Sequence, residues 1–424
     1  MTGQLAFVES PVQLLNVLEW AHAQSAAADP SGPGLPGVPG RPGSALPPPG
    51  VVGRRSAGLG VPADGVWGRV GTTHDGAAPV GTASTGSLGT TGGGEVAADL
   101  TLVVLSPTDP MSRGQLRRMA QLARDDGFTV RWQEARHGRG SLARTLRDLA
   151  PLLRAAERVI VGDPFSRYVQ LLLTLFAPKQ LTVVDDGTAT MEYAAQLARG
   201  ERLVRWHRRG SSRGPRELVL APVSAAARRK LAPTRRRAVE IFTSLPVEPP
   251  PGTTVTPNTF AWTRARFGPP RLTRGSDLVG TSLVETGVVD ADQYTRAVAD
   301  LAATHGATRY FAHRRESAVK LHRIAVETGL EIVRPDLPLE LIARRGPIGR
   351  TVVSFPSTVV HTLPLALAGT GVKVAVCEIA PEWLKANVSP RAQGFLAGVA
   401  GTAAFEVDRL TARATPTAER FEFG

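Results

Sequence analysis

Cysteine is almost absent from this sequence, and that absence limits its chemistry. The only cysteine among the 424 residues is Cys377, so the chain can form no internal disulfide. The neighbours of this cysteine, Val374, Ala375 and Val376, are apolar. Such surroundings predict a buried thiol on a β-strand rather than a reactive nucleophile.

Long hydrophobic runs and a secretory leader are missing as well. The most apolar stretches, 169–176 and 372–379, are much shorter than the roughly 20 residues that cross a bilayer, and they predict buried strands or helices. Residues 1–8 lack the basic start and the uninterrupted apolar core of a signal peptide. The sequence therefore predicts a cytoplasmic protein.

The familiar nucleotide and metal motifs do not occur either. No G-x-x-x-x-G-K-[ST] loop is present, and no G-x-G-x-x-G follows a strand and opens a helix, which disfavours kinases and dehydrogenases. The chain also lacks H-E-x-x-H, paired C-x-x-C and any dense cluster of His and Asp. We therefore expect chemistry without a metal or a resident cofactor.

What the sequence does contain is enough apolar material for two cores, because 42% of its residues are hydrophobic. Residues 27–98 are an exception, since they consist mainly of Gly, Pro, Ser, Thr and Ala without periodicity. This composition predicts a disordered insertion. Just before it, Ser10 is the expected N-cap of a helix whose first residue is Pro11.

Short apolar runs alternate with amphipathic segments on both sides of a basic, Pro-rich stretch at 201–275. This alternation is typical of parallel βαβ units, and two such series predict an α/β protein with two Rossmann-like, doubly wound domains. The expected domains are 1–26 with 99–200, the connection 201–275, and 276–424. The expected strands are 5–8, 100–105, 129–132, 159–161, 181–184, 278–282, 309–312, 331–333, 351–354 and 373–377; the expected helices are 12–20, 111–124, 142–155, 166–176, 190–198, 291–304, 317–328, 337–343 and 358–366.

Ligands bind beyond the carboxyl ends of the strands in open α/β sheets, so the polar residues at those ends are the first candidates for chemistry. Asp185 and Asp186 directly follow an apolar strand and precede Gly187, which permits a tight turn. Adjacent carboxylates repel each other, and partial burial raises the pKa of one of them towards that of a general base. The alternative is an Asx turn that caps the next helix.

Two further candidates lie in the second series. His313 follows a predicted strand, where an imidazole can protonate or hydrogen-bond a departing phosphate; the alternative is a structural or solvated histidine. Ser357 and Thr358 open a helix, where hydroxyl groups and free N–H groups bind anions; the alternative is an ordinary N-cap. His361, four residues after Ser357, shares its helix face and is a weaker phosphate candidate.

Between Arg202 and Arg237, basic residues are interleaved with Trp206 and His207. This segment is a candidate contact for an acidic glycan or for the inner face of the membrane, where the protein would bind peripherally. The alternative is a solvated Arg-rich loop, since no helix with a large apolar face accompanies the charges. We expect no nucleic-acid partner.

In sequence order these motifs resemble those of the bacterial sialyltransferases and polysialyltransferases. That group has an acidic-acidic-Gly motif, a His-Pro motif and a paired Ser/Thr motif, which Asp185-Asp186-Gly187, His313-Arg314 and Ser357-Thr358 match here. The resemblance covers most of the chain outside 27–98. It extends to the run 9–16, to Gly162-Asp163, to the run 184–190 and to Gly287-Val288-Val289 before Tyr294.

The resemblance implies a GT-B arrangement, in which two Rossmann-like domains face a central cleft. The amino-terminal domain would bind the acceptor, such as a capsule or cell-surface glycan, and the carboxyl-terminal domain a CMP-activated sugar. Asp185 or Asp186 would deprotonate the acceptor hydroxyl, and His313 would assist the departure of CMP. Ser357 and Thr358 would bind its phosphate, and the anomeric centre would invert in one displacement. Ser10 and Gly187 would support the turns.

One departure from the family pattern affects the donor. Arg314 stands where the group has proline, which alters the backbone next to the histidine and adds a guanidinium that can bind phosphate. The leading prediction is transfer of a sialic acid or related nonulosonic acid from its CMP donor to a glycan. Two alternatives stay open: an enzyme that uses another nucleotide sugar, and a binding or scaffold protein that catalyses nothing.

Overall fold

The computed structural model describes residues 3–28, 99–136, 140–203 and 225–385, together with Gly398, Gly401 and 408–410. The predicted insertion lies outside these residues except at Ala27 and Ala28. These two residues end the first helix, so the predicted boundary at residue 27 is two residues too early. All described residues belong to one compact unit.

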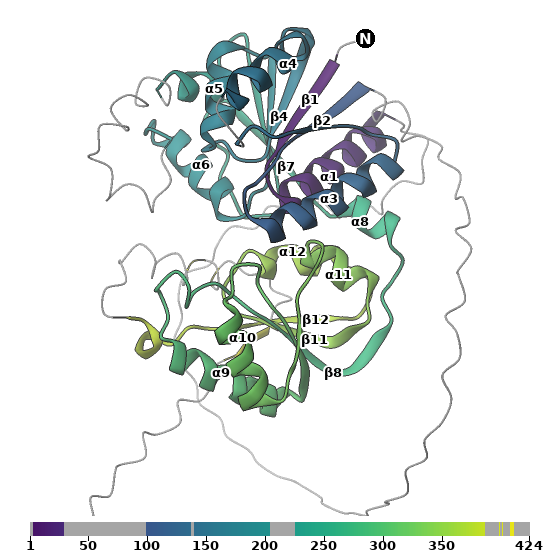
Figure 1. Cartoon of the computed structure of the whole chain (residues 1–424), viewed down its shortest axis with the longest axis vertical. Helices are drawn as coiled ribbons and strands as arrows, with labels where there is room; N and C mark the ends of the chain where they lie inside the picture. The colour runs from purple at the N-terminus through teal and green to yellow at the C-terminus, as the bar shows by residue number, and fades with distance from the viewer. Residues whose placement is uncertain are drawn as a thin grey trace, which may run out of the picture. The chain divides into compact units, whose positions relative to one another are not determined.

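The first half of the chain forms a parallel sheet of seven strands in the order β3-β2-β1-β4-β5-β6-β7 (Figure 1). Because the chain leaves β1 towards one neighbour and later returns to the other, the topology reverses between β1 and β4, as in doubly wound folds. Its strands are β1 Gly3–Val8, β2 Leu100–Leu105, β3 Thr129–Gln133, β4 Ala156–Val161, β5 Gln180–Val184, β6 Ala238–Thr243 and β7 Thr253–Pro257; its helices are α1 Pro11–Ala28, α3 Pro110–Asp125, α4 Ser141–Ala155, α5 Arg167–Leu175, α6 Thr188–Ala198 and α8 Ala261–Arg266.

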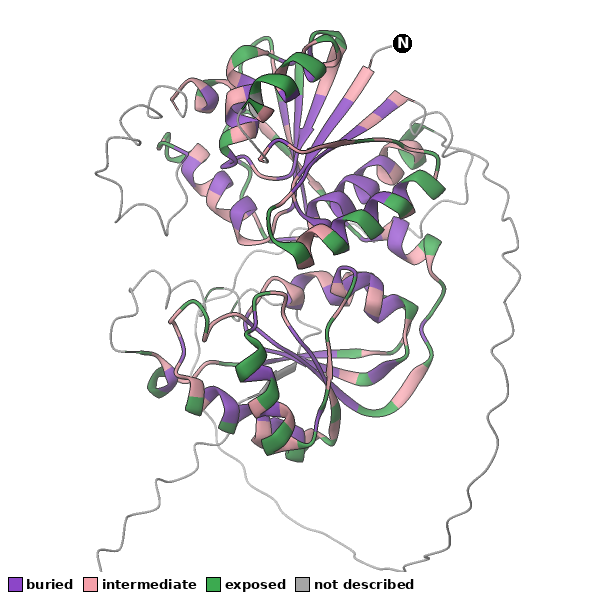
Figure 2. Cartoon of the chain, in the orientation of Figure 1, coloured by how far each residue is buried: buried purple, intermediate pink, exposed green. Residues whose placement is uncertain are grey.

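Helices cover both faces of this sheet, because alternate residues of a strand point to opposite faces. Ala6 and Val8 of β1 pack in the core with α1 and α3, whereas Leu5 and Phe7 pack in the core with α4, α5 and α6. Figure 2 shows the result, with buried strands between helices whose outer faces are exposed. Burial on both faces explains why these strands are continuous apolar runs in the sequence.

The second half repeats the plan in a parallel sheet of six strands, ordered β10-β9-β8-β11-β12-β13. Its strands are β8 Leu272–Val279, β9 Ala307–Phe311, β10 Glu331–Val333, β11 Ile348–Ser354, β12 Lys373–Cys377 and β13 Asp408–Leu410; its helices are α9 Ala291–His305, α10 Ala318–Thr328, α11 Leu339–Arg345 and α12 Val359–Ala366. One core packs α9 and α10 against the sheet, and the other packs α11 and α12. The prediction of two Rossmann-like, doubly wound sheets is confirmed, and Cys377 is buried on β12 as expected.

The stretch 201–275 is more than the connection that the sequence predicted. Within it, β6 and β7 pair parallel at the edge of the first sheet, and Val239, Ile241 and Phe242 of β6 are buried. The basic and Pro-rich residues around this short apolar run hid its strand pattern. Of the basic segment itself, 204–224 lies outside the described residues.

Hydrogen bonds and ion pairs join the two halves. The Nε2 atom of Gln115 on α3 donates to the carbonyl of Pro335 at 2.6 Å, and Arg118 pairs with Asp336 at 2.7 Å. Arg344 of α11 donates through Nε to the carbonyl of Phe267 at 3.0 Å. None of the described helices is long and apolar enough to span a membrane.

Candidate active site

Asp185 is a buried carboxylate at the carboxyl end of β5, next to the end of β6. Its Oδ1 accepts a hydrogen bond from the Thr243 hydroxyl at 2.5 Å. Its Oδ2 accepts from the backbone N–H of Ser244 at 2.7 Å and from the Ser244 hydroxyl at 3.0 Å. Burial raises the pKa of Asp185, although these hydrogen bonds oppose the shift. The side chain thus ties two strand ends together.

Asp186 occupies a different environment from its neighbour. Its side chain is half-buried, and its backbone N–H donates to the Thr190 hydroxyl of α6 at 3.0 Å. The carbonyl of Asp185 accepts from the Asn16 side chain of α1 at 2.9 Å, which fixes the backbone between the two aspartates. Asp186 is therefore held at the surface end of a rigid turn.

Gly187 completes this turn and approaches the second half of the chain. Its φ of 62° and ψ of −131° are open to glycine and strained for other residues, and it is the N-cap of α6. A β-carbon added at Gly187 would lie 3.4 Å from Oγ1 of Thr358. The structure thus brings together the Asp-Asp-Gly and Ser-Thr motifs, which are far apart in the sequence.

Ser357 and Thr358 follow β11 and begin α12. Thr358 is the N-cap residue, but its side chain makes no capping hydrogen bond, unlike the ordinary N-cap that was the alternative. The Ser357 hydroxyl lies 3.5 Å from the Ser354 hydroxyl, and both Ser357 and Thr358 are half-buried. Their hydroxyl groups and the start of α12 form a set of donors suited to an anion.

His313 lies in the turn after β9, as predicted, and its surroundings keep it neutral. Its Nδ1 accepts from the backbone N–H of Arg315 at 3.2 Å, so the neutral ring carries its proton on Nε2. Burial, aided by the positive charges of Arg314, Arg315 and Lys320, lowers the pKa of His313 to about 4. At neutral pH this imidazole is a hydrogen-bond donor through Nε2–H.

Arg314 lies close enough to the first half of the chain to affect its charges. Hydrogen bonds from Ser112 lower the pKa of Asp109, the N-cap residue of α3, and the Arg314 guanidinium adds a smaller effect in the same direction. The strand-end turns after β2 and β9 therefore lie within electrostatic range of each other. An arginine at this position adds positive charge beside His313.

His361 is placed differently from the other candidates. It lies on α12 and is only 7% exposed, and its Nε2 has no hydrogen-bond partner among the described residues. Burial lowers the pKa of His361 and keeps it neutral. Its predicted role as a phosphate contact stays a prediction.

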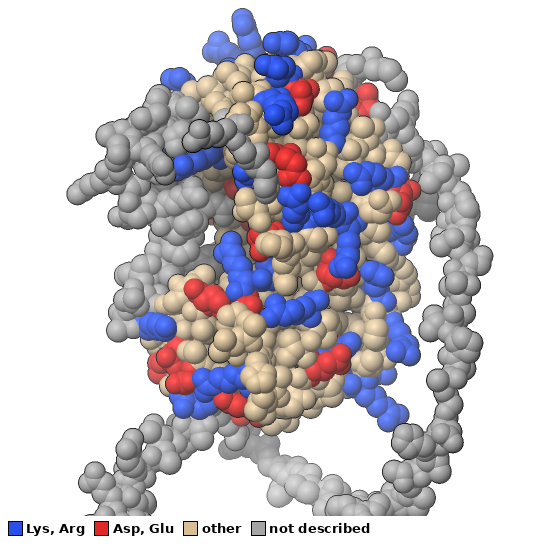
Figure 3. All heavy atoms as spheres, viewed as in Figure 1, with Lys and Arg blue, Asp and Glu red and all other residues tan. Residues whose placement is uncertain are grey.

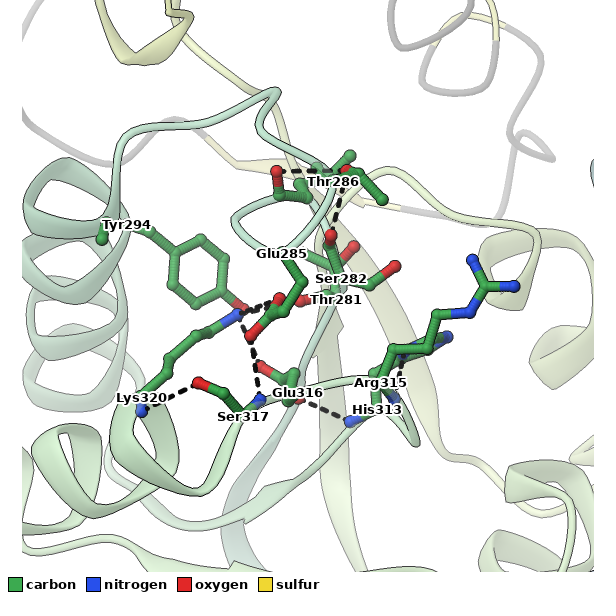
Figure 4. Close-up of polar contacts among 12 residues, drawn as sticks. Thr281, Ser282, Glu285, Thr286, Tyr294, His313, Arg315, Glu316, Ser317 and Lys320 are labelled. Atoms are coloured by element: carbon green, nitrogen blue, oxygen red, sulfur yellow. Dashed lines mark hydrogen bonds and ion pairs between the residues drawn. The ribbon is translucent and has the colours of Figure 1, made fainter. Parts of the chain in front are cut away.

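A buried polar cluster beside His313 was not foreseen from the sequence (Figure 4). Glu316 of the same turn is its centre, with Lys320 of α10 and Glu285 of the loop after β8 around it. The hydroxyl groups of Tyr294 and Tyr310, 2.7 Å apart, complete the cluster. The spacing of Glu316 and Lys320 by one helical turn was the one signal available in the sequence.

A second unforeseen group lies where β1 and β3 end. Arg136 pairs with Glu9 at 2.6 Å and stacks on the ring of Tyr168, and the Ser166 hydroxyl donates to the other oxygen of Glu9. Burial raises the pKa of Glu9. Nearby, the Ser10 hydroxyl accepts from a backbone N–H of α1, as the predicted N-cap does. These residues hold the turn after β1 rigidly.

One surface groove of about 380 Å³ lies over α3 and β3. Arg117, Arg124, Trp132 and Glu134 line it, and no predicted site residue does. On the face shown in Figure 3, basic side chains are spread among acidic ones rather than gathered in one patch. Neither feature defines a second site.

No protein-family model and no curated protein matches the sequence. The solved structures that it resembles include an α/β-galactoside α-2,3-sialyltransferase from Photobacterium phosphoreum, with 8% identity, a TM-score of 0.42, and coverage of 96% of this chain and 98% of that one. They also include the GT-B domain of a sialyltransferase from Photobacterium damselae, with 10% identity, a TM-score of 0.38, and coverage of 96% and 100%. A Listeria monocytogenes protein assigned as a UDP-N-acetylglucosamine 2-epimerase has 11% identity, a TM-score of 0.44, and coverage of 97% and 84%. At these values the likeness identifies neither the reaction nor the substrate.

Proposed function

We propose that this chain is an inverting glycosyltransferase that moves a sialic acid or related nonulosonic acid from a CMP donor to a glycan hydroxyl. The observation that carries the proposal is the approach of the Asp-Asp-Gly turn to Thr358. A candidate base at the end of β5 and a candidate anion site at the start of α12 thereby become neighbours. Such a pairing suits the transfer of a sugar from a donor whose leaving group is a phosphate.

In this mechanism Asp186 is the general base, because it is half-buried and can be reached by an acceptor, whereas Asp185 is only 3% exposed. Asp186 takes the proton of the acceptor hydroxyl, and the hydroxyl oxygen forms a bond to the anomeric carbon. The bond from that carbon to the phosphate oxygen of the donor breaks, and CMP leaves with the bonding electrons. Asp185 holds the turn that aims Asp186.

The negative charge that develops on the phosphate is met by groups of the second half. The Ser357 and Thr358 hydroxyls and the start of α12 donate hydrogen bonds to it. His313 donates through Nε2–H as a neutral imidazole. It becomes a proton donor only if the bound phosphate raises its pKa. Arg314 adds a charge-assisted contact.

Arg314 also favours a second candidate, transfer from a different nucleotide sugar. A guanidinium in place of the expected proline changes the donors around the phosphate, and a diphosphate donor carries an additional phosphate group for it to bind. A panel of CMP-, UDP- and GDP-sugars compares the two functions directly. A chain that binds these donors tightly without turning any over would be a binding protein.

The test is CMP release from CMP-sialic acid by the full chain, with and without a panel of glycans. Asp186→Asn should slow release by about 100- to 10,000-fold, the usual contribution of a general base. His313→Ala should slow it by about 100- to 1,000-fold, the usual contribution of one hydrogen-bond donor to a developing negative charge. Asp125→Asn and His322→Ala alter exposed residues of the same types and should leave the rate unchanged. Wild-type rates in both active-site variants would overturn the proposed roles.

A further inference from the structure

Glu316 is buried so completely that its neighbours define its role. Its side chain is 0% exposed, and donors surround both of its oxygens. Oε2 accepts from the backbone N–H of His313 at 2.5 Å. Oε1 accepts from the Tyr310 hydroxyl at 2.6 Å and from Nζ of Lys320 at 2.7 Å. The carboxylate of Glu316 is therefore hydrogen-bonded directly to the backbone of His313.

Lys320 connects the Glu316 carboxylate to the loop that follows the neighbouring strand, β8. Its Nζ donates to the carbonyl of Thr281 at 2.9 Å, lies 3.4 Å from Oε2 of Glu285 and sits 4.1 Å from the ring centre of Tyr294. Figure 4 shows the Lys320 side chain extending from α10 to the loop after β8, which carries Thr281 and Glu285. The turn after β9 and the loop after β8 are thus held by one cation.

The loop after β8 contributes its own fit to this cluster. A β-carbon at Gly280 would lie 2.2 Å from Oε2 of Glu316 and 2.5 Å from the Tyr310 hydroxyl, so the backbone passes directly over the buried carboxylate. Glu285 from the same loop accepts a hydrogen bond from the backbone N–H of Ser317, the N-cap of α10, at 3.1 Å. The loop after β8 therefore contacts the turn after β9 at two places, through Gly280 at its start and through Glu285 further along.

Stability alone is a poor reason for such a cluster. Two charges lose their hydration when they are buried, and well-packed apolar residues in place of a buried ion pair are often as stable or more so. What an apolar replacement cannot supply is an acceptor for the His313 N–H and a fixed charge beside the imidazole. Both features act on His313.

We propose that Glu316 and Lys320 are positioning residues for His313, which hold its turn so that Nε2–H points to the leaving phosphate. This inference rests on the proposed function, because it assigns a purpose to the orientation of His313. In this role neither Glu316 nor Lys320 contacts the substrate. Both act through the turn after β9.

The pair also sets the charge around the imidazole. Arg314 and Arg315 of its own turn and Lys320 of α10 act electrostatically on His313, and Glu316 accepts from its backbone N–H. Glu285 of the loop after β8 contacts Lys320, and Tyr310 of β9 contacts Glu316. The cation of Lys320 contributes to lowering the pKa of His313. Its removal should raise that pKa by loss of repulsion.

The first experiment needs no substrate. The full chain, labelled with ¹⁵N in its histidine rings, is titrated by NMR as wild type and as Lys320→Met, with His313→Ala to assign the signal. We expect a His313 pKa of about 4 and the Nε2–H form in wild type, and a higher pKa in Lys320→Met. Arg323→Met removes a cation of the exposed i,i+4 pair with Glu327 on the same helix and should change neither.

The second experiment measures CMP release by Glu316→Gln. A turn displaced by about 1 Å costs up to 100-fold in rate, so we expect kcat to fall about 10- to 100-fold with little change in KM. Glu327→Gln is the matched control and should keep the wild-type kcat. The double variant E316Q/K320M removes both buried charges, so no unpaired charge is left, and it should still have a low kcat.

The outcomes separate the two proposals. An unchanged pKa and tautomer of His313 in Lys320→Met would overturn the positioning role whether or not the protein releases CMP. So would a wild-type kcat in Glu316→Gln, or a kcat that is restored with stability in the double variant. The predicted pKa change in a protein that releases no CMP from any donor would contradict the proposed function and leave the coupling of the pair to His313 supported.

Discussion

The Thr243 hydroxyl lies 2.5 Å from Oδ1 of Asp185 and donates to it, and the residue after Thr243 occupies the other oxygen of the same carboxylate. These bonds cross from β6 to β5, between residues 58 positions apart. Asp186 has a different environment, although it is the next residue along. If Asp186 is the base as proposed, the two adjacent aspartates have separable roles, one structural and one chemical, and their variants should fail in different ways.

Asp185→Asn should lower stability, whereas Asp186→Asn should lower turnover. An amide at position 185 places a donor against the Thr243 hydroxyl or the N–H of Ser244, and leaving buried groups unpaired costs about 1–3 kcal/mol in the free energy of unfolding. Urea unfolding and CMP release, measured on both variants, check this. An Asp186→Asn variant as active as wild type but much less stable would reverse the assignment.

Gly187→Ala should destabilise the chain and disturb Thr358. The backbone there has φ 62° and ψ −131°, a region that costs a residue with a β-carbon about 1–3 kcal/mol, and the new methyl group would press on the Thr358 hydroxyl. Gly114→Ala on α3 meets no atom within 4 Å and should stabilise by about 0.5–1 kcal/mol. Thermal unfolding distinguishes them, and equal melting temperatures would contradict the strain at Gly187.

The sequence was sufficient for elements whose pattern is local. The strands at 100–105, 331–333 and 373–377 were predicted with the bounds that the structure has, since each is an apolar run flanked by turn signals. Strand β6 was missed because its apolar residues lie between basic and Pro-rich segments, where no amphipathic helix marks a βαβ unit.

The same limit explains which candidate site residues the sequence could suggest. The rule that ligands lie at strand carboxyl ends selected Asp185, Asp186 and His313 from their position after apolar runs. It could not find Thr243, because its contact with Asp185 requires β5 and β6 to be neighbours, which only the strand order shows. The contact of Lys320 with Thr281 was hidden for the same reason, because Thr281 lies on the loop after β8, 39 residues away.

Arg314→Ala should weaken donor binding more than it slows chemistry, if Arg314 contacts the phosphate as proposed. Charge-assisted hydrogen bonds contribute about 1.5–3 kcal/mol, so KM for the CMP donor should rise about 10- to 100-fold. Arg350→Ala removes an equal charge at an exposed position of β11 and should leave KM unchanged. Steady-state kinetics at low and high salt check this, and an unchanged donor KM in Arg314→Ala would exclude the contact.

Glu19→Gln should make stability less dependent on pH. Glu19 of α1 is 2% exposed, and burial raises its pKa from 4.5 to about 7, although hydrogen bonds from Trp262 and Thr263 oppose the shift. Between pH 4.5 and 7 the folded chain keeps a proton here that the unfolded chain has lost. The free energy of unfolding therefore falls as pH rises through this window, by up to about 3 kcal/mol from this one group.

Urea unfolding at several pH values should show this decline in wild type and in the exposed control Glu327→Gln, and a shallower one in Glu19→Gln. Equal slopes in wild type and Glu19→Gln would mean that Glu19 is ionised throughout, with its three hydrogen bonds outweighing its burial.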